Sequence, residues 1–339
     1  MEPLDGFMPW LLLPFVVTLL VSGLGVLAVP WQADPRVAEV APPLSKPGQA
    51  NCPADLAKPA DTITWSLPAS EHHASPVTYT IERWTGDASC EAGTRQGRYL
   101  TENVLLEDGK LVILARRHCD SPTDANETAG WCWGHPRGPQ YSVGRAHVQG
   151  FGMAGADFEW GFVATVPQDA AKGARSALWL LNDWRAQYCD DTYAEIDVME
   201  WYSSTNDARA TTHATCRINP DDTTSKMTID AGSPADDPDI PSVDWTRPHT
   251  WTVKKETDEA QRTVEVSYLL DGEAFSTHSC TSAGLTFETC DAAFSEAWQG
   301  ILQTAVFSGL SGAFTGPDAA ARFPRQRLVI SDMWVKPLT

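Results

Sequence analysis

Three carboxylates crowd one short, apolar run of this sequence, 194–201, which reads AEIDVMEW. The acids are Glu195, Asp197 and Glu200, with no Lys or Arg among them. On an ordinary solvated strand face such crowding repels and destabilises. In an active site the same repulsion raises one pKa, so that a carboxylic acid stays protonated near neutrality beside a carboxylate. The run therefore favours acid–base and nucleophilic chemistry over a plain solvent-facing strand.

The spacing of these acids sets a geometric condition. Side chains at i and i+2 of a strand share a face, so Glu195 and Asp197 point together, whereas Glu200 falls on the other face. A β-bulge near Val198 or Met199 would return Glu200 to the first face. The two glutamates then lie about four strand steps apart, roughly 13 Å between backbones at ~3.3 Å per step. Inward-leaning side chains bring the ~5–5.5 Å carboxyl separation of a retaining glycosidase within reach.

The elements around this run are predicted to be strands. Periodicity close to two begins near Tyr79, and the strands 101–106 and 110–116 flank Glu107-Asp108-Gly109, which indicates a hairpin. Asp271-Gly272 indicates another turn, and no convincing amphipathic helix of about a dozen residues occurs. Many short strands favour an all-β sandwich or jelly roll. Further strand-like runs are 158–166, 177–181, 195–201, 250–254, 264–270, 301–307 and 328–335.

Composition excludes some classes of protein. The chain has 339 residues, with 25 Lys and Arg against 44 Asp and Glu, a formal charge of −19. A body this acidic repels phosphate backbones, so nucleic-acid binding is not expected. Fourteen Trp residues suit stacking on sugar rings as well as a core.

The N-terminus predicts export. No charge occurs from Pro9 to Val29, about the length of a bilayer crossing, although Glu2 and Asp5 stand where a signal peptide usually carries basic residues. We expect residues 1–30 to be a signal or membrane anchor, 31–60 a Pro/Ala-rich linker, and 61–339 the folded domain. The protein is then extracellular, either secreted or anchored to the outer face of the membrane.

Cysteine usage agrees with export. The chain has eight Cys and no C-x-x-C pair, which disfavours zinc ribbons and thioredoxin-type sites. Among the possible pairings, the short loops Cys119–Cys132 and Cys280–Cys290 are the two that we predict. Asn126 begins a glycosylation sequon.

Other catalytic motifs are either absent or lack the structural context that they require. Residues 150–155 satisfy G-x-G-x-x-G, but a strand-like run follows them where a dinucleotide site needs a helix. Neither G-x-S-x-G nor H-E-x-x-H occurs, so the sequence lacks both the nucleophile motif of serine hydrolases and the zinc-binding motif of zincins.

The acidic run resembles the Glu-x-Asp-x-x-Glu motif of family 16 glycoside hydrolases, in the variant with a bulged catalytic strand. The resemblance covers roughly residues 99–339. It rests on TENVLLEDGKLVILARR, YSVGRAH, DFEWGFVATVP, SALWLLN, HTWTV, YLLDGEAF, ILQTAVFSG and RLVISDMWVKP, in that order.

This resemblance implies a concanavalin-like β-jelly roll of two antiparallel sheets with a concave substrate cleft. It implies retaining double displacement, with Glu195 as nucleophile, Glu200 as acid/base and Asp197 hydrogen-bonded between them. No cofactor is required; a structural calcium ion is common in the family, but no ligand pattern here places one. The expected partner is a polysaccharide, and the chain is expected to be a monomer.

Five further residues are candidates for sugar binding. Trp179 and Trp184 precede the acidic run, and His213 matches a His often present on the neighbouring strand; Trp201 and Trp298 complete the set. Each has a structural alternative, since Trp in a sandwich is at least as often core.

Two function classes remain open. The first is an endo-acting hydrolase of β-1,3 or β-1,3-1,4 glucan, with a transglycosylase on the same scaffold as its variant. The second is a non-catalytic, lectin-like glucan-binding protein. Binding proteins derived from the family usually lack one or both glutamates, and both are present here.

Overall fold

The computed structural model describes most of the chain after residue 56. The described ranges are 57–88, 95–117, 141–168, 171–182, 193–218, 224–234, 243–307 and 323–338. The predicted signal or anchor, most of the linker, Asn126, Trp184 and the Cys119–Cys132 pair lie outside them. Among the described residues, no helix is both long and apolar enough to cross a membrane.

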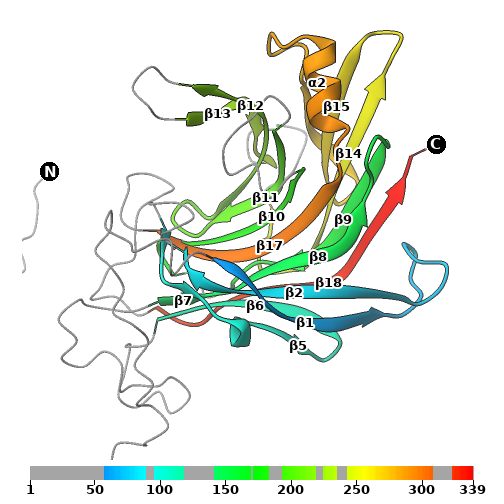
Figure 1. Ribbon diagram of the computed structural model, residues 1–339. Coiled ribbons are helices and arrows are strands. Elements are labelled where there is room, and N and C mark those ends of the chain that lie inside the picture. The colour runs from blue at the N-terminus through cyan, green and yellow to red at the C-terminus, as the bar shows by residue number, and fades with distance from the viewer. Residues whose placement is uncertain are drawn as a thin grey trace, which may run out of the picture. The chain divides into compact units, whose positions relative to one another are not determined.

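The described strands form two layers, which we call the front sheet and the back sheet (Figure 1). The front sheet runs β13 (Thr224–Gly232), β12 (Asp207–Ile218), β11 (Ala194–Tyr202), β10 (Ala174–Leu181), β17 (Trp298–Phe307), β8 (Arg145–Gly152), β2 (Val77–Asp87), β1 (Lys58–Leu67), with β3 (Arg95–Gln96) on the end of β17. The back sheet runs β16 (Glu273–Ser279), β15 (Thr263–Leu270), β14 (His249–Asp258), β9 (Phe158–Thr165), β18 (Gln326–Pro337), β6 (Lys110–Arg117), then β5 (Val104–Glu107) and β7 (Tyr141–Val143), with β4 (Arg98–Tyr99) on β7.

The pairing confirms the predicted all-β sandwich. All pairs of described strands are antiparallel except β4 with β7, and the end of β2 joins the two sheets by pairing with β4. The β1 strand begins at Lys58, slightly before the domain start expected at residue 61. The α2 helix (Phe287–Phe294) has eight residues, which is shorter than the amphipathic helices of about a dozen residues that the sequence pattern disfavours.

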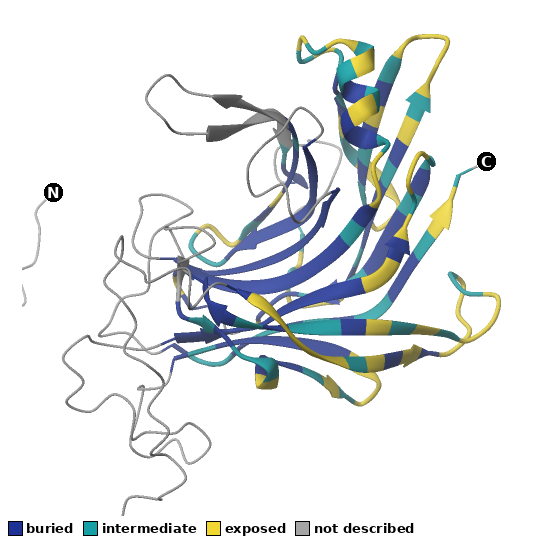
Figure 2. Ribbon diagram, viewed as in Figure 1, coloured by how far each residue is buried: buried dark blue, intermediate teal, exposed yellow. Residues whose placement is uncertain are grey.

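The core lies between the sheets, where period-two alternation buries one face of each strand. On β10, Leu178 and Leu180 join this main core, whereas Trp179 lies in a smaller cluster on the other face. Figure 2 shows that the central strands β10, β11 and β17 are buried along their length, while hairpin tips are exposed. The central front-sheet strands therefore carry buried side chains on both faces, and the outer face holds the candidate site.

Turn chemistry fixes the predicted hairpins. Asp108 and Gly109 connect β5 to β6 with φ of 50° and 76°, the left-handed values that a two-residue hairpin turn requires. Asp271-Gly272 does the same between β15 and β16. The expected strand 101–106 is wrong at its start, because Thr101–Asn103 forms a 3₁₀ turn, η3, before β5 begins.

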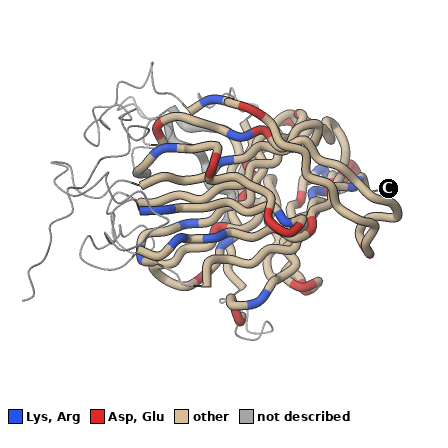
Figure 3. Tube along the Cα trace, turned by 90° about the horizontal axis from the view of Figure 1, so that it is seen from below, with Lys and Arg blue, Asp and Glu red and all other residues tan. Residues whose placement is uncertain are grey.

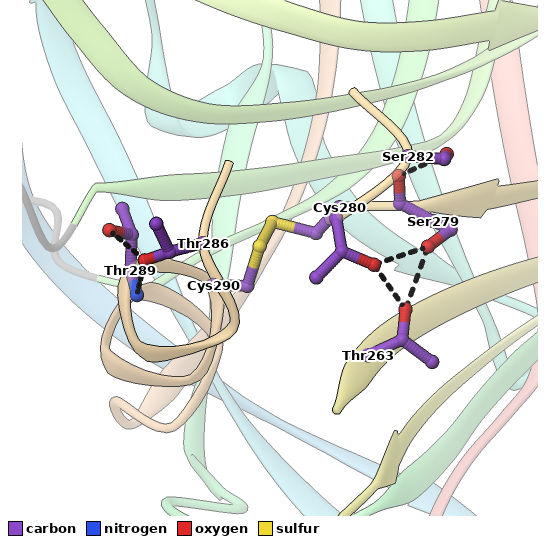
Figure 4. The surroundings of a disulfide bond; sticks show 8 residues. Thr263, Ser279, Cys280, Ser282, Thr286, Thr289 and Cys290 are labelled. Atoms are coloured by element: carbon purple, nitrogen blue, oxygen red, sulfur yellow. Dashed lines mark hydrogen bonds between the residues drawn. A yellow bond between two sulfur atoms is a disulfide. The ribbon is translucent and has the colours of Figure 1, made fainter. Parts of the chain in front are cut away.

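The predicted disulfide between Cys280 and Cys290 is present, with its Cα atoms 5.9 Å apart (Figure 4). It ties the end of β16 to α2, whose N-cap Thr286 accepts a hydrogen bond from the Thr289 backbone N–H. This bridge and the helix cap together fix the segment between β16 and β17.

Candidate active site

The β11 strand carries the predicted bulge. Asp197 and Glu200 pair with Thr211 and Arg209 on β12, so three steps on β11 face two steps on its neighbour. On the β10 side the register shifts at the same place, beside Val198. One extra residue therefore lies between Asp197 and Glu200 on both edges, as the spacing predicted.

The bulge sorts the side chains of β11 into two faces. Those of the main core are Ile196, Val198, Met199 and Trp201. Glu195, Asp197 and Glu200 lie on the opposite face, and all three are buried. Three carboxylates thus converge on the outer face of the front sheet, where water is largely excluded.

Glu195 has a buried phenol beside it. The Tyr193 hydroxyl donates a hydrogen bond to Glu195 Oε2. Burial, and then the negative charge of Glu195, raise the pKa of Tyr193 far above its ordinary value. The phenol therefore keeps its proton and acts as a donor that orients Glu195.

A buried guanidinium lies near the same acid. Arg145 on β8 packs over the rings of Trp84 and Trp179, at 4.8 and 5.5 Å from their centroids. Burial lowers the pKa of Arg145 to about 9, and the charge of Glu195 acts in the opposite direction. Arg145 thus provides positive potential on the Glu195 side of the site.

Asp197 is linked to the neighbouring strand. His213 Nε2 lies 3.3 Å from Asp197 Oδ2, and His213 is the register partner of Glu195. Ligand atoms of Glu195, Asp197 and His213 lie within 4.8 Å of one another, so these three residues could also hold a metal ion. In either case His213 fixes the orientation of the central carboxylate.

Glu200 accepts hydrogen bonds from three side chains. Arg175 on β10 forms an ion pair with Glu200 Oε1, and the Tyr202 hydroxyl donates to the same atom at 3.1 Å. Thr211 Oγ1 donates to Oε2 at 3.5 Å. These contacts hold the Glu200 carboxyl on the face that it shares with Glu195.

The predicted sugar-binding residues divide into three groups. Trp179 lies on the same face as the acids and pairs in register with Asp197, and His213 contacts Asp197 directly. Trp201 and Trp298, 0% and 3% exposed, belong instead to the main core. This placement argues against contact with a sugar, because side chains directed between the sheets cannot reach a ligand on the outer face. Trp184 lies outside the described residues.

Several site residues escaped the sequence analysis. Tyr193 and Tyr202 each stand two positions from a glutamate, so alternation along β11 could have placed them on its face. Arg145, Arg175 and Thr211 come from other strands. Only the strand register, which the sequence does not reveal, brings them to the site.

The architecture and the placement of the acids define a β-jelly-roll sandwich with an acidic centre on one sheet. Solved structures with this fold include an endo-1,3-β-glucanase from Streptomyces sioyaensis, with 22% identity and a TM-score of 0.54, covering 82% of this chain and 95% of that one. Two laminarinases also match. That from Rhodothermus marinus has 17% identity and a TM-score of 0.53, covering 84% and 99% of the two chains. That from Thermotoga petrophila has 20% identity and a TM-score of 0.52, covering 83% and 98%.

No family sequence model and no curated protein sequence matches the chain. At these identities the structural likeness establishes the shared fold.

Proposed function

We propose that the protein is a retaining, endo-acting glycoside hydrolase that cleaves a β-linked polysaccharide, specifically a β-1,3 or β-1,3-1,4 glucan. The observation that carries the proposal is the bulge that places Glu195, Asp197 and Glu200 on one buried face of the front sheet. The β-1,3-glucan substrate is taken from the named activities of solved structures with this fold, and the β-1,3-1,4 alternative from the resemblance of the sequence.

The proposed reaction has two balanced steps. Glu195 attacks the anomeric carbon, while protonated Glu200 gives its proton to the departing glycosidic oxygen, leaving a glycosyl ester on Glu195. Ionised Glu200 then takes a proton from water, whose oxygen attacks the same carbon and releases Glu195. Two inversions retain the configuration. Asp197 holds the nucleophile in place, and no cofactor enters either step.

The surroundings of the acids support this assignment of roles. Tyr193 donates to Glu195, and Arg145 lies on the same side, so both favour the charged nucleophile. Trp179 beside Asp197 offers an aromatic ring next to the reacting centre. We also propose that the chain is exported, a setting in which the Cys280–Cys290 bridge persists.

The test is release of reducing ends from laminarin, lichenan, agarose and carrageenan, with Glu195→Gln as the matched inactive variant. We expect activity on laminarin or lichenan and none from the variant. Full turnover by Glu195→Gln would refute the nucleophile. Binding of laminarin without any cleavage would favour the lectin-like alternative, and longer products in the presence of a short acceptor would favour a transglycosylase.

A further inference from the structure

Arg175 is a buried cation that the two proposed steps do not use. It lies on β10, is 9% exposed, and pairs in register with Tyr202. Its Nη2 donates to Glu200 Oε1, and its guanidinium lies 5.8 Å from the centroid of the Tyr202 ring. Glu200, Arg175 and Tyr202 therefore form one packed unit on the outer face of the front sheet (strands β10 and β11 in Figure 1).

This unit favours the charged form of Glu200. Arg175, Tyr202 and Thr211 all present donors to the Glu200 carboxyl. Hydrogen bonds and an opposite charge both stabilise a carboxylate over the neutral acid. A general acid must nevertheless carry a proton in the first step, so Arg175 works against the first step and favours the second.

Other charged groups near Glu200 act less directly. Both strands that flank β11 contribute charged groups, and Figure 3 shows that residues of both signs are distributed over the strands. Arg209, the register partner of Glu200, is 53% exposed in its side chain and lies 3.9 Å from Asp207. The titratable and charged groups facing this region are Glu195, Asp197 and Tyr202 on β11, Arg175 on β10, and Arg209 and His213 on β12.

We propose that Arg175 is a positioning residue that acts through Glu200: it orients this carboxyl and lowers the pH at which the proposed acid loses its proton. The inference rests on the proposed function. It predicts that the alkaline decline of activity occurs at a lower pH when Arg175 is present than when it is replaced. It also predicts that departure of the leaving group, rather than hydrolysis of the glycosyl ester, limits turnover at neutral pH.

The experiment compares the pH profile of kcat/KM on laminarin for wild type, Arg175→Met, Arg175→Lys and the control Arg209→Met. In Arg175→Met we expect the alkaline limb to move upward by about 1 pH unit or more. Arg175→Lys keeps the charge and is expected to stay near wild type, and Arg209→Met is expected to match it. An unshifted alkaline limb in folded Arg175→Met overturns the proposal, as does an equal shift in Arg209→Met.

A second measurement applies if Arg175→Met does not fold. The Glu200 carboxyl is titrated in the wild-type protein by ¹³C NMR and assigned by the loss of its signal in Glu200→Gln. A midpoint nearer the ordinary value of about 4.3 supports the proposal, and one nearer the value of about 6 found for a buried glycosidase acid overturns it. Absence of glucanase activity in the wild type would instead count against the proposed function, which separates the two failures.

Discussion

His213 lies 3.3 Å from Asp197, Nε2 to Oδ2, and stands directly opposite Glu195 in the pairing of β11 with β12. A residue on the neighbouring strand thus fixes the carboxylate that lies between the two proposed catalytic glutamates. Asp197 is buried and its Oδ1 accepts no hydrogen bond from the described residues, so its orientation depends on few partners. The contact makes His213 a part of the site that can be tested separately from the acids.

We expect His213→Ala to reduce kcat by about tenfold or more, because a close polar contact to a charged group contributes roughly 1.5–3 kcal/mol. The measurement is steady-state kinetics on laminarin. His213→Gln, which keeps a polar nitrogen within reach, serves as the control and should recover part of the loss. Unchanged kcat in His213→Ala would show that Asp197 needs no partner on β12.

The proposed roles of Glu195 and Glu200 predict opposite stereochemistry in rescue experiments. Glu200→Ala should lose about 10²–10⁴-fold on polysaccharide, the usual contribution of a general acid–base group. On an aryl glycoside with a good leaving group the first step needs no proton, and azide should then restore turnover with a β-glycosyl azide as product. Glu195→Ala with azide should give the α-azide. The β-azide from Glu195→Ala would contradict the assignment.

The bulge predicts the effect of changing the number of residues between Asp197 and Glu200 on β11. Because Val198 and Met199 both join the main core, deleting Val198 leaves a strand of strict alternation in which Glu200 still faces Glu195. We therefore expect the deletion to keep measurable activity while losing about 1.5–3 kcal/mol of stability with the buried Val side chain.

The matched control deletes Met199 as well as Val198. Glu200 then lies three steps from Glu195, an odd number, so strict alternation turns it toward the core and activity should vanish. Thermal unfolding and laminarin hydrolysis are measured on both proteins. An inactive but folded single deletion together with an active double deletion would refute the account of the bulge.

The sequence predicted those features that depend on local rules. The hairpin at Asp108-Gly109 follows from turn chemistry, and the bulge follows from the odd spacing of Glu195 and Glu200. The same reasoning could have excluded Trp201, which follows Glu200 directly and must face the core once the bulge is accepted. Residue type alone, which favours Trp as a ring that stacks on sugars, does not reveal which face of the strand Trp201 occupies.

Contacts between strands were beyond prediction. The ion pair of Arg175 with Glu200 depends on the register of β10 against β11. That register is set by packing across the sheet, and one slipped residue would turn Arg175 toward the core. The Arg145–Glu195 interaction needs in addition the order β11-β10-β17-β8, which no local pattern encodes.

Buried His147 predicts how stability depends on pH. Arg145 Nε donates to His147 Nε2 at 2.7 Å, so this ring is neutral, and it stacks on Trp84. Burial, and then the Arg145 charge, hold the pKa of His147 well below 6.5. Below that pH the unfolded chain binds a proton that the folded chain does not, so stability falls as the pH drops.

We therefore expect the unfolding free energy to decrease as the pH falls below about 6.5, with a slope from this residue approaching 1.4 kcal/mol per pH unit. His147→Gln should flatten that slope, measured by urea unfolding across the pH range. His72→Gln, at a more exposed site in the loop between β1 and β2, is the control. Equal slopes in wild type and His147→Gln would show that other groups cause the dependence.

The disulfide and α2 connect stability to the site. Asn182 donates to the Ala293 carbonyl of α2 at 2.7 Å and accepts from the Ala194 N–H at 3.0 Å, so α2 is tied to the residue just before Glu195. Removing the Cys280–Cys290 bridge should lower the unfolding free energy by about 2–3 kcal/mol, because it frees a short loop in the unfolded chain.

We expect the Cys280→Ala/Cys290→Ala protein to keep nearly full activity at 25 °C and to inactivate at a lower temperature than wild type. Asn182→Ala provides the comparison, since it breaks the link to β11 but leaves the bridge intact and should reduce kcat already at 25 °C. Calorimetry and temperature-dependent kinetics distinguish the two effects. Loss of activity at 25 °C in the double Cys variant, with no loss in Asn182→Ala, would mean that the bridge rather than Asn182 positions Glu195.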